Sequence, residues 1–397
     1  MSDRFADFIN VKDFGDLVVD GDWAPAIQAA DDYASVPDAD DKVKSVWFPP
    51  YVYRASNIRK GRAEWWGAGR YATFILATEE ADDDRYLIAS PSWLTPGSQF
   101  GDRPTGIYDM MIDSLEAREN AYVLRSYFTT MEGVHIKGGT VADLLISTDA
   151  ADGTHHSSSG SIGNLNFVRC WFGFSSADTD YNILQVDSAK VNTDCHLLGC
   201  FLSGATVMNL SLTNQAAGWD VEGNHMYGAP INISATHGPG FRVSGNIFED
   251  DCIFRSSTNT YQPVDIGPGN WFWGDHVSAY FENNSATLDQ MVLYGNRYSA
   301  GTELRHCYNT ASKMLVSRDE IFINADPFKF YSGATPAGAS AGIIQLINAK
   351  FKDVPQAVNL SFTGVGSSNA AYLAKPSDIL TNAAYADRGS LGWHHKT

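Results

Sequence analysis

The stretch Val221-Glu222-Gly223-Asn224-His225-Met226 carries the pattern that decides the fold. It places an apolar residue two positions before Gly, then Asn, then a second apolar residue two positions after the Asn. The same order returns in Val243-Ser244-Gly245-Asn246-Ile247-Phe248 and in Leu293-Tyr294-Gly295-Asn296-Arg297-Tyr298. A short pattern that recurs along one chain indicates a repeat architecture.

The position of the Asn marks an anchor in each repeat, and other residues take this position where the pattern is weaker. The anchors counted in this way are Met110, Val134, Cys170, Cys200, Asn224, Asn246, Asn270, Asn296, Asp319 and Ala349. They lie about 27 residues apart on average, within the range of roughly 20–50 residues that is typical of solenoids. A length of 397 residues alone suggests two or three domains. The repeat instead predicts one long solenoid.

The composition of the repeats predicts strands, because the segments are short and rich in Val, Ile, Phe and Trp. The apolar residues three before and two after the anchor are an odd number of positions apart, so a continuous strand would point them to opposite faces. The Gly-Asn step must therefore bend the chain, since both residues tolerate left-handed backbone angles. We expect an all-β fold, a right-handed parallel β-helix. Its inward stack would hold Phe172, Leu202, Met226, Phe248, Phe272, Tyr298 and Ile321.

A β-sandwich whose Gly-Asn pairs mark hairpin turns is the alternative, but hairpins predict shorter and more paired spacings.

The five cysteines are odd in number and lack CxxC spacing, which favours reduced, buried thiols. They are Cys170, Cys195, Cys200, Cys252 and Cys307.

The charge balance is strongly acidic, with 28 Lys and Arg against 46 Asp and Glu and a net charge of -18. Such a charge opposes binding to nucleic acid or to an anionic membrane, so we expect neither as a partner. No apolar run approaches the ~20 residues of a membrane span. The first residues, MSDRFADFINVKDFG, lack the basic and apolar parts of a signal peptide.

A second signature lies near the N-terminus. It consists of Ile9-Asn10-Val11-Lys12-Asp13-Phe14-Gly15, Asp20-Gly21-Asp22, Ala26-Ile27-Gln28-Ala29-Ala30 and Phe48-Pro49-Pro50. This order resembles the start of the pectate-lyase-like β-helix superfamily, in particular of phage tailspike depolymerases. Two departures are the Trp23-Ala24-Pro25 segment and Tyr51. The resemblance implies a cap that seals the solenoid, and the apolar spacing and Pro25 predict its helix over residues 24–33.

The resemblance and the repeats together predict three parts. Residues 1–60 would form the N-terminal cap and first strands, 61–352 the β-helix body, and 353–397 a C-terminal cap or oligomerisation element. The resemblance further implies a homotrimer that is made in the host cytoplasm, attaches to a virion tail and acts outside the cell on bacterial surface polysaccharide.

The outer face must carry any chemistry, because the inside of a solenoid is filled. Alternation predicts outward side chains at four and two positions before each anchor and at one and three after it. One strip would then hold the candidate catalytic residues Asp220, Glu222, Glu249 and His225. It would also hold the candidate substrate-binding residues His196, Arg242, Tyr227, Trp171, Trp271, Trp273 and Arg297.

These residue types suit glycan chemistry. Glycoside hydrolysis uses two carboxyl groups, ~5 Å apart for retention or ~6.5–9.5 Å for inversion, and aromatic faces form platforms for sugar rings. Hydrolysis of a capsular or exopolysaccharide is the first expectation. β-Elimination from a uronic acid is the alternative, with a base such as His225 or Tyr227 and a cation such as Arg242. A non-catalytic glycan-binding adhesin would use the same strip.

No metal and no cofactor is assigned. The Asp-rich runs at 38–41 and 82–84 lack the spacing of a calcium loop and are more typical of solvated surface.

Overall fold

A computed structural model of the 397-residue chain gives the structure of the protein. It describes residues 8–98, 101–102, 105–154, 162–173, 179–186, 192–216, 218–238, 240–260, 264–273, 278–283, 290–299, 303–309, 314–323, 326–329, 343–347, 350–352, 358–359 and 372–374. The chain divides into two compact units, Met1–Ser211 and Leu212–Thr397.

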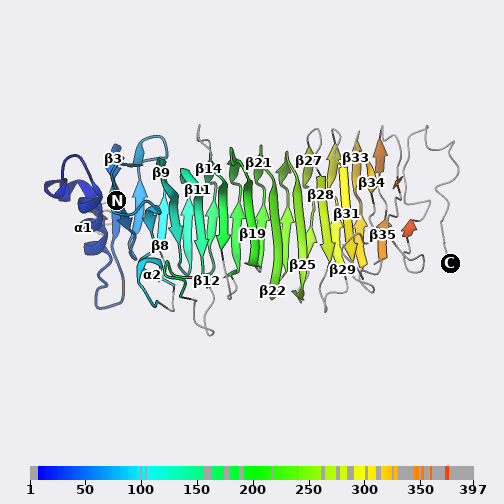
Figure 1. Ribbon diagram of the computed structural model, residues 1–397, viewed down its shortest axis with the longest axis horizontal. Coiled ribbons are helices and arrows are strands. Elements are labelled where there is room, and N and C mark those ends of the chain that lie inside the picture. The colour runs from blue at the N-terminus through cyan, green and yellow to red at the C-terminus, as the bar shows by residue number, and fades with distance from the viewer. Residues whose placement is uncertain are drawn as a thin grey trace. The chain divides into compact units, whose positions relative to one another are not determined.

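The first unit is built from coils whose strands all pair in parallel with the strands of neighbouring coils, drawn as adjacent arrows in Figure 1. One sheet has the order β1 (Phe8–Asn10), β2 (Ser45–Phe48), β5 (Glu64–Gly67), β8 (Thr105–Tyr108), β10 (Thr129–Glu132), β13 (Asn166–Val168) and β17 (Cys195–Leu198). After a turn, the coils continue into β3 (Tyr51–Ala55), β6 (Thr73–Ala77), β9 (Met111–Leu124), β11 (His135–Ser147), β14 (Trp171–Gly173) and β18 (Phe201–Ser203). Further strands are β4 (Ile58–Arg59), β7 (Tyr86–Ala89), β12 (Ile162–Gly163), β15 (Tyr181–Val186) and β16 (Asn192–Thr193).

The second unit repeats this organisation in three stacks of parallel strands. The first stack is β20 (Trp219–Glu222), β23 (Phe241–Ser244), β26 (Asp265–Ile266), β29 (Gln290–Tyr294), β32 (Met314–Arg318), β35 (Ile343–Ile347) and β38 (Tyr372–Ala374). The second is β21 (His225–Tyr227), β24 (Ile247–Phe248), β27 (Trp271–Trp273), β30 (Arg297–Ser299), β33 (Ile321–Ile323) and β36 (Lys350–Lys352). The third is β22 (Ile231–Gly238), β25 (Cys252–Thr260), β28 (Ser278–Asn283), β31 (Glu303–Asn309), β34 (Asp326–Lys329) and β37 (Val358–Asn359). Strand β19 (Met208–Ala216) spans the division between the units. The predicted right-handed parallel β-helix is confirmed.

The predicted capping helix is confirmed as α1 (Ala24–Ala34), which follows the 3-10 turn η1 (Val11–Leu17) and has Pro25 in its first turn. Its buried Asp31 accepts hydrogen bonds from the indole Nε1 of Trp65 and from the backbone N of Gly61, both across 2.6 Å. Burial raises the pKa of Asp31. Nearby, burial lowers the pKa of Lys60 to about 8. The helix is thus joined to the first coils by buried polar contacts as well as by its apolar face.

The turn before each described anchor bends the chain as predicted, and a left-handed residue makes the bend. The predicted anchor Ala349 lies outside the described residues. In the second unit glycine takes this position in several coils, with φ of 67° at Gly223 and 66° at Gly245. In the first unit non-glycine residues share the task, with φ of 52° at both Asp109 and Arg169. The left-handed residue therefore precedes the anchor, and the anchor itself turns inward.

The anchor asparagines of the second unit form a buried ladder. Nδ2 of Asn224 donates to Oδ1 of Asn246 across 2.9 Å, Asn246 to Asn270 across 3.0 Å, and Asn270 to Asn296 across 2.9 Å. The amides of Asn246, Asn270 and Asn296 also donate to backbone carbonyls of an adjacent coil, as where Asn246 donates to the carbonyl of Val221 across 2.9 Å. Buried polar groups need such partners, so the ladder locks the register of successive coils.

The inward stack is confirmed for six of the seven predicted residues. These six side chains are buried: Phe172, Leu202, Met226, Phe248, Phe272 and Tyr298. Phe272 stacks on Phe248 with ring centroids 5.1 Å apart and on Tyr298 across 4.8 Å.

The prediction for Ile321 is wrong by one position. The strand register pairs Arg297 with Ile321, so the anchor that follows Asn296 is Glu320 instead of Asp319. Asp319 takes the left-handed corner, with φ of 56°, and the buried Glu320 accepts from Asn296 Nδ2 across 3.1 Å. Ile321 is consequently only half-buried.

Four of the described cysteines are buried thiols outside any disulfide, as predicted: Cys170, Cys195, Cys200 and Cys252. The side chain of Cys307 lies outside the described residues.

Among the described residues, no helix combines the length and apolar character of a membrane span. The predicted division at residues 60 and 352 stays a prediction, since most of residues 353–397 lie outside the described part.

Candidate functional site

A row of charged side chains crosses three neighbouring strands of the second unit. Strand pairing places Asp220 of β20 opposite Arg242 of β23, and Arg242 opposite Asp265 of β26. Arg242 donates from Nε to Asp220 Oδ1 across 3.0 Å and from Nη2 to Oδ2 across 2.8 Å. This bidentate contact raises the pKa of Arg242 and fixes the direction of the Asp220 carboxylate.

Asp265 is a residue that the sequence reasoning missed. Counting four positions back from Asn270 reaches Ile266, which is buried. The turn Gly267-Pro268-Gly269 is one residue longer than the corresponding Ser244-Gly245 turn, which moves the outward position to Asp265. The Gly-Pro-Gly stretch, a turn signal ahead of an anchor, is the feature that identifies the shift. Burial raises the pKa of Asp265, and Arg242 partly opposes this effect.

A second row lies on the strands that follow the corner in the same unit. The register aligns His225, Ile247, Trp271 and Arg297 on β21, β24, β27 and β30. The Arg297 guanidinium lies 4.8 Å from the ring centroid of Trp271, whose indole Nε1 donates to Ser299 Oγ across 2.6 Å. The Trp271 and Trp273 rings lie 5.7 Å apart, so two aromatic side chains share one outer edge.

His225 and Glu249 form the closest acid–base contact of this second row. Nε2 of His225 lies within hydrogen-bond distance of Glu249 Oε1, and the Glu249 side chain is the more buried of the two. Tyr227 is exposed two positions beyond His225 on the same strand. A histidine held by a carboxylate and reaching solvent has the arrangement of a general base.

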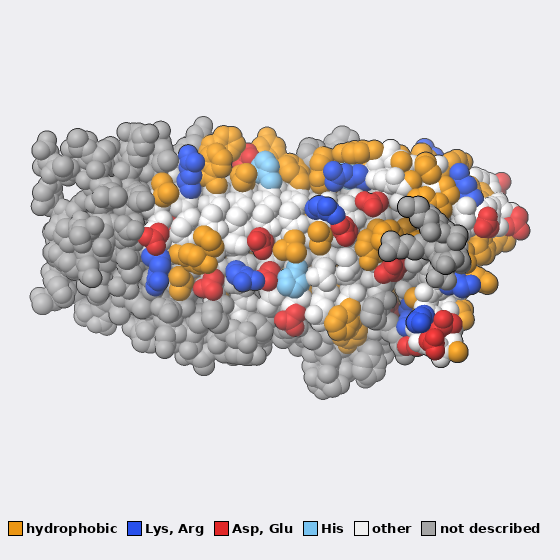
Figure 2. All heavy atoms as spheres, turned by 180° about the vertical axis from the view of Figure 1, so that it is seen from behind, with side chains coloured by type: hydrophobic (Ala, Val, Ile, Leu, Met, Phe, Trp, Pro, Cys, Tyr) orange, Lys and Arg blue, Asp and Glu red, His pale blue; other side chains and the backbone are white. Residues whose placement is uncertain are grey.

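The predicted strip of the second unit therefore consists of two rows on the strands of two sheets, one before and one after the left-handed corner. Asp220, Glu222 and Arg242 lie before it, and the remaining predicted residues of the unit lie after it. Figure 2 shows one face of the molecule, on which charged, histidine and hydrophobic side chains lie on both sides of a band of backbone and other side chains.

Trp171 and His196 belong to the first unit. Trp171 on β14 lies between His135 and Phe201 of the adjoining strands, with ring centroids 5.8 Å and 6.0 Å away. His196 on β17 is half-buried and pairs in register with Asn166.

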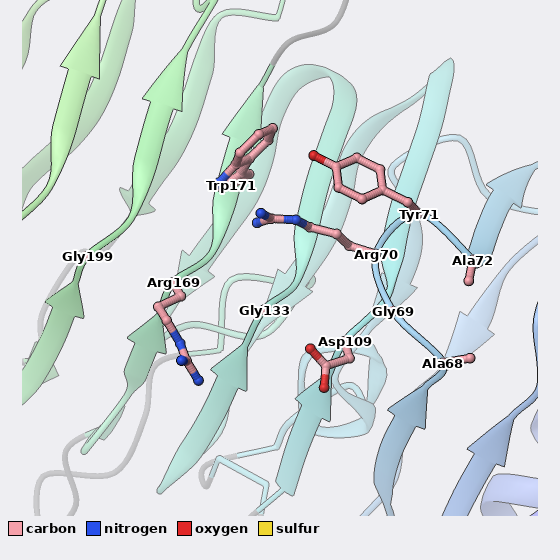
Figure 3. Close-up of a pocket in the computed structure, with 10 residues that line it drawn as sticks. All are labelled: Ala68, Gly69, Arg70, Tyr71, Ala72, Asp109, Gly133, Arg169, Trp171 and Gly199. Atoms are coloured by element: carbon pink, nitrogen blue, oxygen red, sulfur yellow. The ribbon is translucent and has the colours of Figure 1, made fainter.

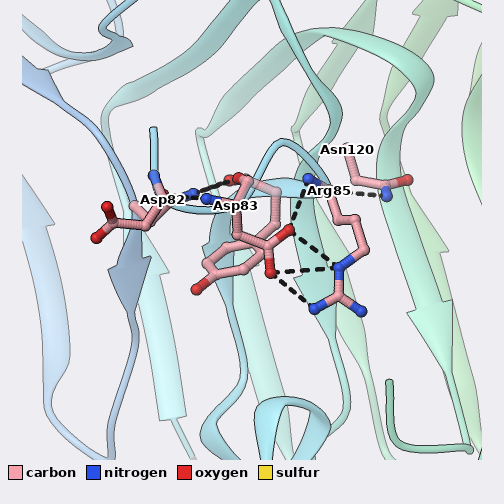
Figure 4. Close-up of polar contacts among 6 residues, drawn as sticks. Asp82, Asp83, Arg85 and Asn120 are labelled. Carbon is pink, nitrogen blue, oxygen red and sulfur yellow. Dashed lines mark hydrogen bonds and ion pairs between the residues drawn. The ribbon is translucent and has the colours of Figure 1, made fainter. Parts of the chain in front are cut away.

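No group of three His, Cys, Asp or Glu side chains suited to a metal ion occurs among the described residues. At the Asp-rich run 82–84, Arg85 donates from Nε and Nη2 to the carboxylate of Asp83 across 2.9 Å and 2.7 Å (Figure 4). Asn57 Oδ1 accepts from the backbone N of Asp82 across 3.1 Å. The Asp83 carboxylate is thus engaged by an arginine, as in a structural surface contact.

No family model matches the chain, and no curated protein matches it. Among solved structures, the chain is similar to Geobacillus virus E2 ORF18, with 13% identity and a TM-score of 0.39 over 96% of this chain and 62% of that one. It is similar to the A-module of the Azotobacter vinelandii mannuronan C-5 epimerase AlgE6, with 15% identity and a TM-score of 0.45 over 94% and 99% of the two chains. It is also similar to the Dettilon tailspike protein, with 10% identity and a TM-score of 0.45 over 94% and 69%. The chain spans less than two thirds of the viral ORF18 chain.

Proposed function

We propose that the protein is a depolymerase that hydrolyses a bacterial capsular or exopolysaccharide on the outer face of its second unit. The observation that carries this proposal is the row Asp220–Arg242–Asp265, in which two carboxyl groups in different environments flank one arginine. Glycoside hydrolysis needs two carboxyl groups with different protonation, one as acid and one as base.

Asp265 is proposed as the general acid, because burial raises its pKa and thereby favours the protonated form. Asp220 is proposed as the base that activates water, because its carboxylate is oriented by both N–H donors of Arg242. The two residues are separated by two inter-strand spacings, or ~9.6 Å. This backbone separation is just above the ~6.5–9.5 Å between the two carboxyl groups of inverting enzymes and far above the ~5 Å of retaining ones, so inversion of the anomeric centre is expected.

Glu222, two positions along the same strand, is one of the carboxylates that the sequence offered beside Asp220. It is exposed to solvent, whereas Asp265 is half-buried. Burial is the usual means of keeping a catalytic carboxyl protonated, and this difference favours Asp265 for the acid.

The aromatic side chains of the same unit supply the sugar platform. Tyr227 is 54% exposed and Trp273 is 41% exposed, which leaves their rings available to the apolar faces of pyranoses. His225, Arg297 and Trp271 complete the proposed binding surface.

β-Elimination on a uronic-acid polymer is the second candidate, and the contact between His225 and Glu249 favours it. In that reaction His225, oriented by Glu249, would remove the proton next to the sugar carboxylate, and Tyr227 would protonate the leaving oxygen.

The test is depolymerisation of purified capsular polysaccharides, followed by size-exclusion chromatography. Hydrolysis predicts new reducing ends without the ultraviolet absorbance of an unsaturated sugar, and NMR of the first products would report the anomeric configuration. Unsaturated products would replace the hydrolytic proposal by elimination. Binding without any change in polymer length would identify an adhesin. Asp40→Asn, at an exposed surface carboxylate of the first unit, is the matched control for the substitutions of Asp220 and Asp265 and should keep full activity.

The proposed function also includes an oligomeric state and a place of action. We expect a homotrimer attached to a phage tail that acts outside the cell. Sedimentation equilibrium of the purified protein tests this expectation, and the mass of a monomer or dimer would contradict it.

A further inference from the structure

A groove of about 720 Å³ lies on the outer face of the first unit, separate from every residue given a catalytic role above. Its volume is within the roughly 300–1,000 Å³ of small-molecule sites. The loop 68–72 between β5 and β6 forms one side, and Trp171 of β14 lies opposite, as Figure 3 shows. The left-handed corner residues of successive coils, including Asp109, Gly133 and Arg169, line the rest.

The loop is fastened by backbone contacts. Gly69 N donates to the carbonyl of Asp109 across 2.8 Å, and Ala68 N donates to Oγ1 of the buried Thr73 across 2.9 Å. The two residues at its tip, Arg70 and Tyr71, are therefore presented to the groove by a constrained turn, and Figure 3 shows both reaching toward Trp171.

Arg70 lies over the face of Trp171, with its guanidinium carbon 4.1 Å from the ring centroid. The guanidinium also lies 5.4 Å from the ring centroid of Tyr71, and its N–H donors make no hydrogen bond to any residue that the structure describes. Among the described residues, no carboxylate lies within ion-pair distance of Arg70. By contrast, Arg169 at the groove is paired with Glu132. Arg70 is thus a preoriented cation that lacks an anionic partner.

Asp109 is the complementary group of the groove. Its carboxylate occupies the space above Gly133, where a Cβ atom would lie 2.5 Å from Asp109 Oδ1. Within the described part of the chain, no side-chain or backbone donor hydrogen-bonds to this carboxylate. It can therefore accept hydrogen bonds from hydroxyl groups of a ligand.

We propose that this groove is a binding subsite for a uronate residue of an acidic polysaccharide. The sugar carboxylate binds the N–H donors of Arg70, the hydroxyl groups donate to Asp109, and the apolar face of the ring packs on Tyr71, which is 65% exposed. A neutral sugar would supply no anion to Arg70, and an inorganic anion would supply no hydroxyl donors to Asp109. The two residues together therefore favour a uronate over either of these ligands. The inference deepens the proposed function and rests on it for the polymeric nature of the ligand.

The experiment is calorimetric titration of the full chain with trimers of galacturonate, mannuronate and glucuronate, each compared with its methyl ester. Esterification removes the charge and keeps the ring. At least one acid trimer is expected to bind about ten- to a hundredfold more tightly than its ester, as for hydrogen bonds to a charged group. If no acid trimer is preferred over its ester, or if inorganic sulfate binds as tightly as the trimers, the proposal is overturned.

Variants locate the effect. Arg70→Gln is expected to remove the preference for acid over ester, Arg70→Lys to retain part of it, and Asp109→Asn to weaken acid and ester alike. Arg59→Gln, an exposed arginine of the same unit that pairs with Asp32, is the control and should keep the preference. Unchanged thermal unfolding establishes that Arg70→Gln is folded. Retention of the acid preference in folded Arg70→Gln would contradict the assignment.

These titrations do not depend on turnover. If the protein cleaves a polysaccharide but its binding of uronate trimers does not depend on Arg70, the uronate subsite is refuted and the depolymerase proposal stands. If binding depends on Arg70 but no polysaccharide is cleaved, the depolymerase proposal is refuted and the subsite stands.

Discussion

The guanidinium of Arg242 binds both carboxylate oxygens of Asp220 on the neighbouring coil, across 3.0 Å from Nε and 2.8 Å from Nη2. The contact is made between strands, so its geometry is set by the parallel register of β20 and β23. It gives the outer row one oriented carboxylate beside the half-buried Asp265.

Asp220→Asn is expected to lower the rate of polysaccharide cleavage by about a hundredfold or more, because the proposed base is lost while the outward position keeps its size. Arg242→Lys keeps the charge but loses the bidentate geometry, so a smaller loss is expected. Release of reducing ends measures both. Full activity of folded Asp220→Asn would exclude this residue from the mechanism.

Asp265→Asn tests the general acid. The variant should cleave the polymer at least about a hundredfold more slowly. Its rate on a nitrophenyl glycoside should fall much less, because the nitrophenolate leaving group needs no proton. Since the acid must be protonated, wild-type kcat/KM should fall as pH rises through the raised pKa of Asp265. That alkaline decline should disappear in the variant. An equal loss on both substrates would argue against the assignment.

Glu222→Gln separates the two possible carboxyl pairs. If Asp265 is the acid, the exposed Glu222 can be replaced with little change in rate. A loss as large as that of Asp265→Asn, measured on the same polymer, would instead assign the acid role to Glu222.

Asn246→Ala is expected to destabilise the second unit by about 3 kcal/mol or more. The change removes the acceptor of Asn224 N and the donor to the Val221 carbonyl, and each unsatisfied buried group costs about 1–3 kcal/mol. Urea unfolding followed by circular dichroism measures the loss. A cost below about 1 kcal/mol would mean that water replaces the amide.

Asp143→Asn is expected to change the pH dependence of stability. Burial raises the pKa of Asp143 to about 8 from a usual value of 3.8, so the folded state holds a proton that the unfolded state releases. The free energy of unfolding should therefore fall as pH rises from about 4 to about 8 and level off above this range. The variant cannot ionise and should be less sensitive over the same interval, as thermal unfolding at several pH values would show. An unaltered slope would contradict the raised pKa.

The sequence by itself determined the architecture, since a Gly-Asn step in successive repeats specifies both the bend and the inward apolar stack. It also located the capping helix from Pro25 and its apolar spacing. These features are local, because a left-handed corner and an alternating strand depend on residues within a few positions of each other.

Only the tertiary structure decided which outer side chains meet. The one-residue extension at Gly267-Pro268-Gly269 brings Asp265 beside Arg242, and the corner at Asp319 makes Glu320 the anchor. The placement of Arg70 over Trp171, far away in the sequence, depends on where the loop 68–72 is fastened. The repeat period determines which coils are neighbours, but insertions and loop contacts determine the register, and a shift of one residue turns a side chain to the opposite face.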